Sequence, residues 1–86
     1  MQENSIQSIK CALEADQQGL WNKAHEIIQS INHPLAYQVH AYLHRKEGSL
    51  DTALFWYGRA GIKPFQGLFE QEFAILKENA EQIQYS

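Results

Sequence analysis

Cysteine, positive charge and long apolar runs are scarce in this sequence, and each scarcity argues against a class of protein. Cys11 stands alone, so one chain can form neither an internal disulfide nor a Cys-based zinc site or redox pair. We expect Cys11 to be a small core residue. No apolar run approaches the roughly 20 residues that span a bilayer, and the start, MQENSIQSIK, lacks the pattern of a signal peptide. These absences predict a cytoplasmic protein that does not act on membranes.

The balance of charge disfavours nucleic acid as a partner. The net charge is -3 and the pI is near 5.7, whereas a protein held by phosphate contacts carries a basic surface. Residues 65–86 hold one lysine and four glutamates, while residues 1–64 hold six basic and six acidic residues. A modest basic excess between residues 35 and 64 predicts either a solvated face or a docking point for an acidic protein or peptide. Its members are Arg45, Lys46, Arg59 and Lys63.

Glycine and proline divide the chain into helical segments of one domain, residues 1–86. Asn4 and Gln7 have the spacing of a capping box, and Gly19, Gly48 and Gly61 each follow an apolar row with helical spacing. No alternating, strand-like segment occurs, so we expect an all-α fold with short connections. The predicted helices cover roughly residues 4–17, 20–31, 34–47, 50–60 and 64–85. The rows expected to face inward include Leu50 in the fourth helix and Leu68 and Phe69 in the fifth.

Two segments of the chain repeat at an interval of 29 residues. Gly19 and Gly48 are each followed by alanine after five residues and by a bulky residue after nine. Each copy therefore predicts a helical hairpin, the first at residues 4–31 and the second at residues 34–61.

The second hairpin resembles a tetratricopeptide repeat. The positions that carry the resemblance are Tyr37, Ala41, Gly48, Ala53, Tyr57, Ala60 and Pro64. It implies a tetratricopeptide-like stack of two hairpins with a long C-terminal helix, residues 64–85, as a cap over the exposed end. It also implies binding of a protein or peptide in the groove formed by the hairpins. Because a stack needs about three units, either the cap helix or a homodimer would complete it.

A narrower stretch of the second hairpin is similar to another family. HAYLHRKEGSLDTALFWYGRAG, with AHEIIQ upstream, resembles a motif of small, functionally uncharacterised bacterial and fungal proteins. In that motif an acidic residue follows the glycine and an asparagine comes shortly after, whereas this chain has Ser49 and Thr52. The chain thus lacks two polar groups that a site in that family would offer.

Two histidines and a glutamate share one face of the third predicted helix. At about 100° per residue, His40, His44 and Glu47 fall on one stripe. The simplest interpretation is packing between helices, with Tyr57 or Glu47 as the hydrogen-bond partner. A second is a zinc site, with Glu47 or His25 as the third ligand. A third is metal-free acid/base chemistry by His44 and Glu47.

Three consecutive aromatic residues, Phe55, Trp56 and Tyr57, point in directions 100° apart on a helix, so one of them should be exposed. We expect Phe55 to be that residue. Elsewhere in the chain, Trp21 is the next candidate for an exposed aromatic side chain. The sequence therefore predicts a small interaction module without catalysis or a cofactor; the alternative is a small zinc-dependent hydrolase that uses His40, His44 and Glu47. The predicted ligand-binding residues are Arg45, Lys46, Phe55, Arg59 and Lys63.

Overall fold

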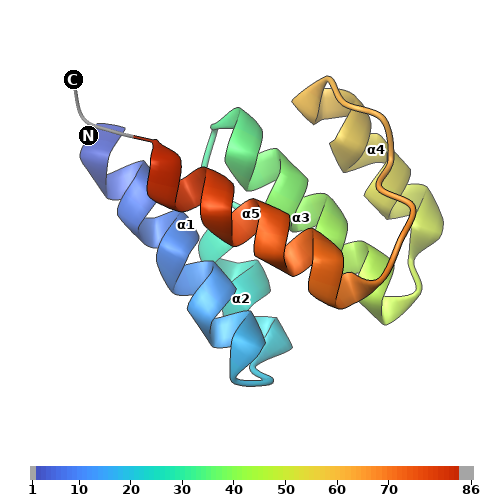
Figure 1. The fold of residues 1–86 in the computed structure, drawn as a ribbon, viewed down its shortest axis with the longest axis horizontal. Helices are drawn as coiled ribbons and strands as arrows, with labels where there is room; N and C mark the ends of the chain where they lie inside the picture. Colours follow the sequence, from blue (N-terminus) through green and yellow to red (C-terminus); the bar gives the residue numbers. More distant parts are fainter. Residues whose placement is uncertain (1, 84–86) are drawn as a thin grey trace.

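The computed structural model describes residues 2–83, with side chains described for residues 5–83, and that part contains five helices and no strand (Figure 1). The all-α prediction is confirmed. In chain order the helices are α1 (Gln2–Gln17), α2 (Trp21–Ile28), α3 (Pro34–Glu47), α4 (Leu50–Ala60) and α5 (Phe69–Gln82).

The predicted limits hold best for α3 and α4, which glycine and proline mark at their ends. Because α1 already begins at Gln2, Asn4 lies inside that helix rather than at its cap, and its side chain is outside the described residues. α5 begins at Phe69 rather than at residue 64, and its predicted end at residue 85 falls outside the described part of the chain.

Both hairpins are built on the same glycine turn. Gly19 and Gly48 adopt φ values of 82° and 91°, a left-handed conformation that costs other residues energy. The residue after each glycine donates its N–H to the carbonyl five residues earlier, Leu20 to Ala15 and Ser49 to His44, both at 2.9 Å. The equivalent bonds are 29 residues apart, so the repeat read from the sequence corresponds to a repeated local structure.

α3 is the central helix of the fold, because it packs against each of the other four. The larger part of the core gathers apolar side chains of α1, α2, α3 and α5. A smaller cluster forms between α3 and α4, where Ala41 and Ala53 are both buried beside Tyr57. Small residues at this point let the two helices approach closely, as the repeat pattern predicts.

The predicted position of the fifth helix is wrong. α5 lies across α1 and α3 (Figure 1), and within residues 2–83 it does not pack as a helix against α4. The segment 61–68 leads the chain away from the end of the hairpins before α5 begins, so the helix covers their side rather than the end formed by α4. Leu76 and Ala80 are buried there, whereas Leu68 and Phe69, expected to face inward, are 63% and 41% exposed.

Cys11 is exposed, contrary to the expectation of a core position. The buried side chains of α1 include Ile9, Ala12 and Leu13, and Cys11 points away from that face. It borders a shallow groove of about 240 Å³ between α1 and α5. None of the helices in residues 2–83 combines the length and apolar character needed to cross a bilayer.

Replacement of Ala53 by leucine should force α3 and α4 apart. Ala53 is only 2% exposed and faces the fully buried Ala41, so added methylenes should lower the free energy of unfolding by about 1 to 3 kcal/mol. Urea unfolding followed by circular dichroism measures this change. Thr52→Leu adds volume at the neighbouring, exposed position and should be nearly neutral; an equal loss in both variants would contradict close packing at Ala53.

Candidate functional site

Three imidazoles meet where α2 crosses α3. His40 and His44 lie one turn apart on α3, and His25 reaches them from α2. The ring centroids are 4.8 Å apart for His25 and His40, 5.0 Å for His25 and His44, and 4.9 Å for His40 and His44. The rings thus form an almost equilateral triangle, which we call the histidine cluster.

The nitrogens of the cluster point at one another. Nε2 of His25 and Nε2 of His40 are 3.1 Å apart, and one potential ligand atom of each of the three histidines lies within 4.8 Å of the others. Since a neutral imidazole carries one N–H, one ring of the His25–His40 pair donates and the other accepts. His25 is therefore the hydrogen-bond partner of His40; of the two partners expected for the imidazoles, Glu47 pairs with His44 and Tyr57 pairs with Glu72 instead.

Two tryptophans hold the imidazole planes. Trp21 stacks on His25 with a centroid distance of 5.0 Å and an interplanar angle of 8°, and Trp56 stacks on His40 at 4.0 Å and 14°. The indole N–H of Trp21 donates to the carbonyl of Leu43 at 2.8 Å. Trp21 is consequently half-buried rather than exposed, and the sequence did not reveal either tryptophan as a neighbour of the histidines.

Glu47 orients the third imidazole. Its Oε2 lies 2.7 Å from Nδ1 of His44 and accepts a hydrogen bond of 2.9 Å from the Ser49 hydroxyl. These two hydrogen bonds hold the pKa of the Glu47 carboxyl below its usual range. Because Glu47 engages Nδ1, Nε2 is the nitrogen of His44 that remains for another ligand. The structure brings His25, and not Glu47, into the group that the sequence proposed as metal ligands.

Burial favours the uncharged form of two members of the cluster. His40 is 5% exposed, and desolvation, together with the nearby His25 and His44, lowers its pKa to about 4. Desolvation also lowers the pKa of His25, with a further contribution from His44. A neutral imidazole keeps a lone pair available on one nitrogen.

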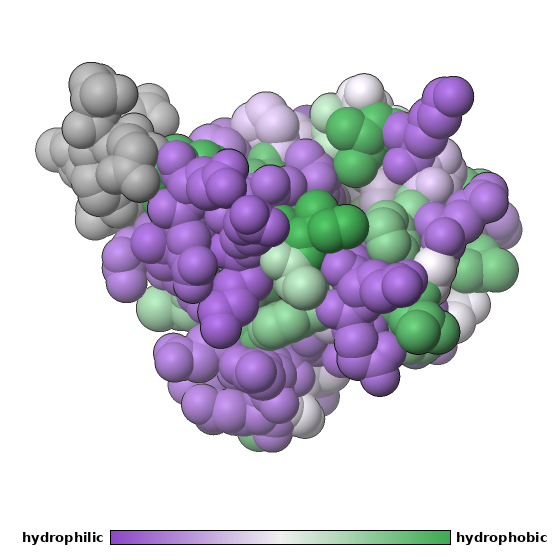
Figure 2. Space-filling view, in the orientation of Figure 1, coloured by the Kyte–Doolittle hydropathy of each residue, from purple (hydrophilic) through white to green (hydrophobic). Residues whose placement is uncertain are grey.

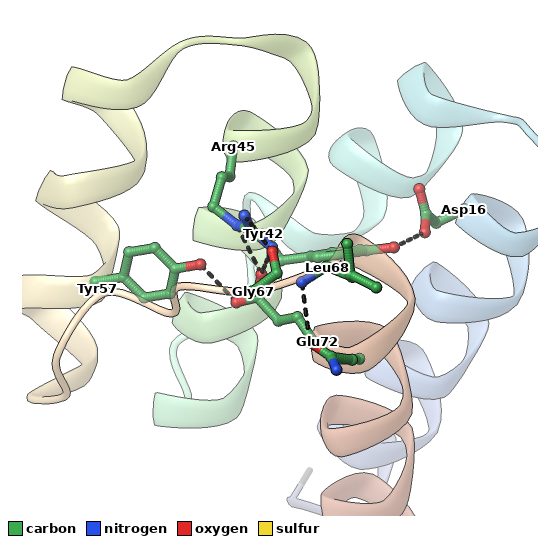
Figure 3. Close-up of polar contacts among 8 residues, drawn as sticks. Asp16, Tyr42, Arg45, Tyr57, Gly67, Leu68 and Glu72 are labelled. Atoms are coloured by element: carbon green, nitrogen blue, oxygen red, sulfur yellow. Dashed lines mark hydrogen bonds and ion pairs between the residues drawn. The ribbon is translucent and has the colours of Figure 1, made fainter.

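Arg45 does not lie on the surface that the sequence assigned to it. Its Nε donates to Oε1 of the buried Glu72 at 3.0 Å, its Nη1 donates to the carbonyl of Gly67 at 3.1 Å, and its side chain is 15% exposed (Figure 3). The Tyr57 hydroxyl donates to the other oxygen of Glu72 at 2.5 Å. Burial and this bond raise the Tyr57 pKa well above its usual range. Arg45 therefore joins α3 to α5.

Lys46 is paired in a similar way on the side of α1. Its Nζ lies 2.8 Å from Oδ1 of the buried Asp16, whose Oδ2 accepts a 2.6 Å hydrogen bond from the Tyr42 hydroxyl. Asp16 and Glu72 are the carboxylates that sequence reasoning missed. Helical spacing could have indicated that both are buried, because Asp16 follows the buried Ala12 by four residues and Glu72 precedes the buried Leu76 by four.

The other predicted binding residues are exposed around α4. Phe55 is 58% exposed, as expected, and Lys63 is exposed just beyond the helix. The Arg59 guanidinium lies over the rings of Tyr37 and Trp56, 4.7 and 5.2 Å from their centroids. Among the side chains of residues 5–83, no carboxylate forms an ion pair with Arg59.

Comparison with known proteins adds no assignment, since no protein-family model, curated protein or solved structure matches the chain.

Loss of Arg45 should destabilise the fold, in contrast to the outcome expected for a surface residue. Arg45→Ala leaves the carboxylate of Glu72 buried without its cation, and we expect a loss of roughly 2 to 4 kcal/mol in unfolding free energy. Arg59→Ala, at the exposed arginine of α4, should cost less than about 1 kcal/mol. Denaturant titrations of both variants test the contrast, and equal stability of Arg45→Ala and wild type would refute the structural role.

Stability should fall as the pH drops below 6.5. His40 stays neutral in the folded chain down to about pH 4, whereas the unfolded chain takes up the proton near 6.5. The stability that neutral His40 contributes is fully present above pH 6.5. Between pH 6.5 and 4 the unfolded chain binds one more proton than the folded chain, so the free energy of unfolding falls by up to about 1.4 kcal/mol per pH unit. His40→Phe should show a shallower decline in urea titrations between about pH 7.5 and 4.5. A slope equal to that of wild type would exclude His40 as the source.

Proposed function

We propose that this protein is a small tetratricopeptide-like interaction module that binds an amphipathic helix of a partner protein along the outer face of α4. One observation carries the proposal. α4 exposes Leu50, Leu54 and Phe55 at 61%, 52% and 58%, and α3 is the one helix that packs along it within residues 2–83. In stacked helical hairpins, this is the face on which a following hairpin packs. We call the three side chains, with Gly58, the α4 face.

The row along the α4 face has the form of a helix-packing surface. Leu50, Leu54 and Gly58 are spaced by four residues and follow one ridge of the helix. Glycine inside a helix costs about 0.5 to 1 kcal/mol relative to alanine. A Cβ at Gly58 would meet no atom within 4 Å, so the fold itself does not require glycine there. Close approach of a second helix accounts for its presence.

The charge beside the α4 face favours an acidic partner. Arg59 is an exposed residue whose guanidinium lies over two aromatic rings and donates to the Tyr37 hydroxyl at 3.4 Å, and no carboxylate among the described side chains forms an ion pair with it. Such a preoriented guanidinium is suited to bind a carboxylate through two parallel hydrogen bonds. Lys63 adds a second exposed cation.

The location differs from the groove expected between the hairpins. α5 already covers the side formed by α1 and α3, and that side is mostly hydrophilic in Figure 2, where apolar residues gather more toward α4. Arg45 and Lys46 are engaged by Glu72 and Asp16. The proposal therefore retains Phe55, Arg59 and Lys63 from the predicted binding set.

A synthetic amphipathic helix with a leucine row flanked by glutamates is the first probe. Chemical shifts of the ¹⁵N-labelled protein should change along α4, and Phe55→Glu should abolish binding. Arg59→Ala should weaken binding by about 10-fold, as expected for loss of a charge-assisted contact. Ile75→Glu is the matched control, because Ile75 is a 46% exposed apolar residue of α5; it should bind as wild type does.

The same three variants serve as baits in extracts of the native cell, where one partner should be lost with Phe55→Glu and retained with Ile75→Glu. Shift changes confined to α1 or α5, or equal losses with Ile75→Glu, would contradict the proposal. A concentration-dependent dimer in analytical ultracentrifugation that Phe55→Glu dissociates would also overturn it, because a second copy would then occupy the α4 face.

A further inference from the structure

The histidine cluster, where α2 of the first hairpin meets α3 of the second, plays no part in the binding proposed for the α4 face. The histidine cluster joins three side chains from two helices, with separations that a metal ion can bridge. We propose that His25, His40 and His44 form a binding site for a late first-row divalent ion of the zinc class, with one coordination position open to an external ligand. The proposal does not depend on the α4 face.

Distances support one shared ion. Zinc–imidazole bonds are about 2.0 to 2.1 Å long, which places two nitrogens in a tetrahedral site about 3.4 Å apart. The Nε2 atoms of His25 and His40 are already 3.1 Å apart. The widest separation in the group, within 4.8 Å, requires side-chain shifts of roughly 1 to 1.5 Å to reach that geometry. His44, which is only partly buried and meets Trp21 edge-on rather than face to face, is the ring that would make most of this shift.

The surroundings resemble those that metal sites use to orient their ligands. Imidazole ligands generally donate their second N–H to a carboxylate or carbonyl, which sets the ring orientation and increases ligand basicity. Glu47 fills this role for His44 at 2.7 Å. Trp21 and Trp56 restrict the rings of His25 and His40 by stacking. The ligands are thus oriented before an ion arrives, so less ordering accompanies binding.

The donor set selects the kind of ion. Magnesium and calcium prefer oxygen ligands, whereas three imidazole nitrogens suit zinc, copper or nickel. Three protein ligands leave a tetrahedral zinc ion one ligand short, as in catalytic rather than structural zinc sites. The 12% exposure of the His44 side chain indicates the side from which an ion and its fourth ligand would enter.

Isothermal titration with zinc chloride tests the site in full-length protein purified without a polyhistidine tag and treated with chelator. We expect one zinc ion per chain, and His25→Ala or His44→Ala should reduce the affinity by at least about 100-fold. Glu47→Gln should reduce it by about 10-fold without changing the stoichiometry. His25 and His44 are chosen because His40 is buried, and circular dichroism should show that each variant is folded.

The fourth histidine provides a matched control. His33 caps the start of α3, where its Nδ1 accepts the N–H of Leu35 at 3.0 Å. His33→Asn keeps a favourable cap and should bind zinc as wild type does. Zinc should also raise the melting temperature of wild type and His33→Asn but not of His25→Ala, because an ion that binds only the folded chain stabilises it.

Cobalt(II) tests the coordination directly. Visible absorption of a tetrahedral cobalt complex should appear with one equivalent, and azide should change it if a coordination position is open. Saturation at other than one ion per chain, or zinc affinities of His25→Ala and His44→Ala equal to wild type, would overturn the site. A cobalt spectrum unaffected by azide would overturn the open position. The imidazoles would then be packing groups joined by the His25–His40 hydrogen bond.

Discussion

α3 is enclosed by its four neighbours, and this enclosure governs the polar chemistry of the molecule. A polar side chain on a surrounded helix must find a partner on the helix that covers it, because an unpaired buried polar group is costly. Tyr42 meets Asp16 of α1, His40 meets His25 of α2, and Arg45 meets Glu72 of α5. Each partner lies on a different helix, so the same interactions that satisfy α3 also position α1, α2 and α5 around it.

Local sequence patterns predicted the helices and turns, whereas packing between segments far apart in the sequence determined where α5 lies. The turns at Gly19 and Gly48 were predictable, because a left-handed residue at a helix end is a local requirement. The place of α5 was not, since the segment 61–68 permits several directions and the sequence does not state which face Leu76 and Ala80 will cover. The exposure of Phe55 followed from helical spacing alone, because three consecutive residues cannot all face inward.

The candidate sites show the same division. The spacing of His40 and His44 placed both rings on one face of α3, but the contribution of His25 depends on how α2 crosses α3. Arg45 was misplaced because its charge predicts exposure unless a buried carboxylate is known, and Glu72 is 27 residues away in the sequence. Regional charge was a poor guide for this reason. One of the four glutamates in residues 65–86 neutralises a cation of α3 rather than contributing to an acidic surface.

Both tryptophans of the chain contact the histidine cluster. Intrinsic tryptophan emission therefore arises from the junction of α2, α3 and α4, and α1 and α5 contribute no tryptophan to it. A partial opening in which α5 leaves the side of α1 and α3 would change the helical circular dichroism more than the emission. Disagreement between these two optical signals during unfolding would thus reveal that the terminal helix separates before the hairpin junction does.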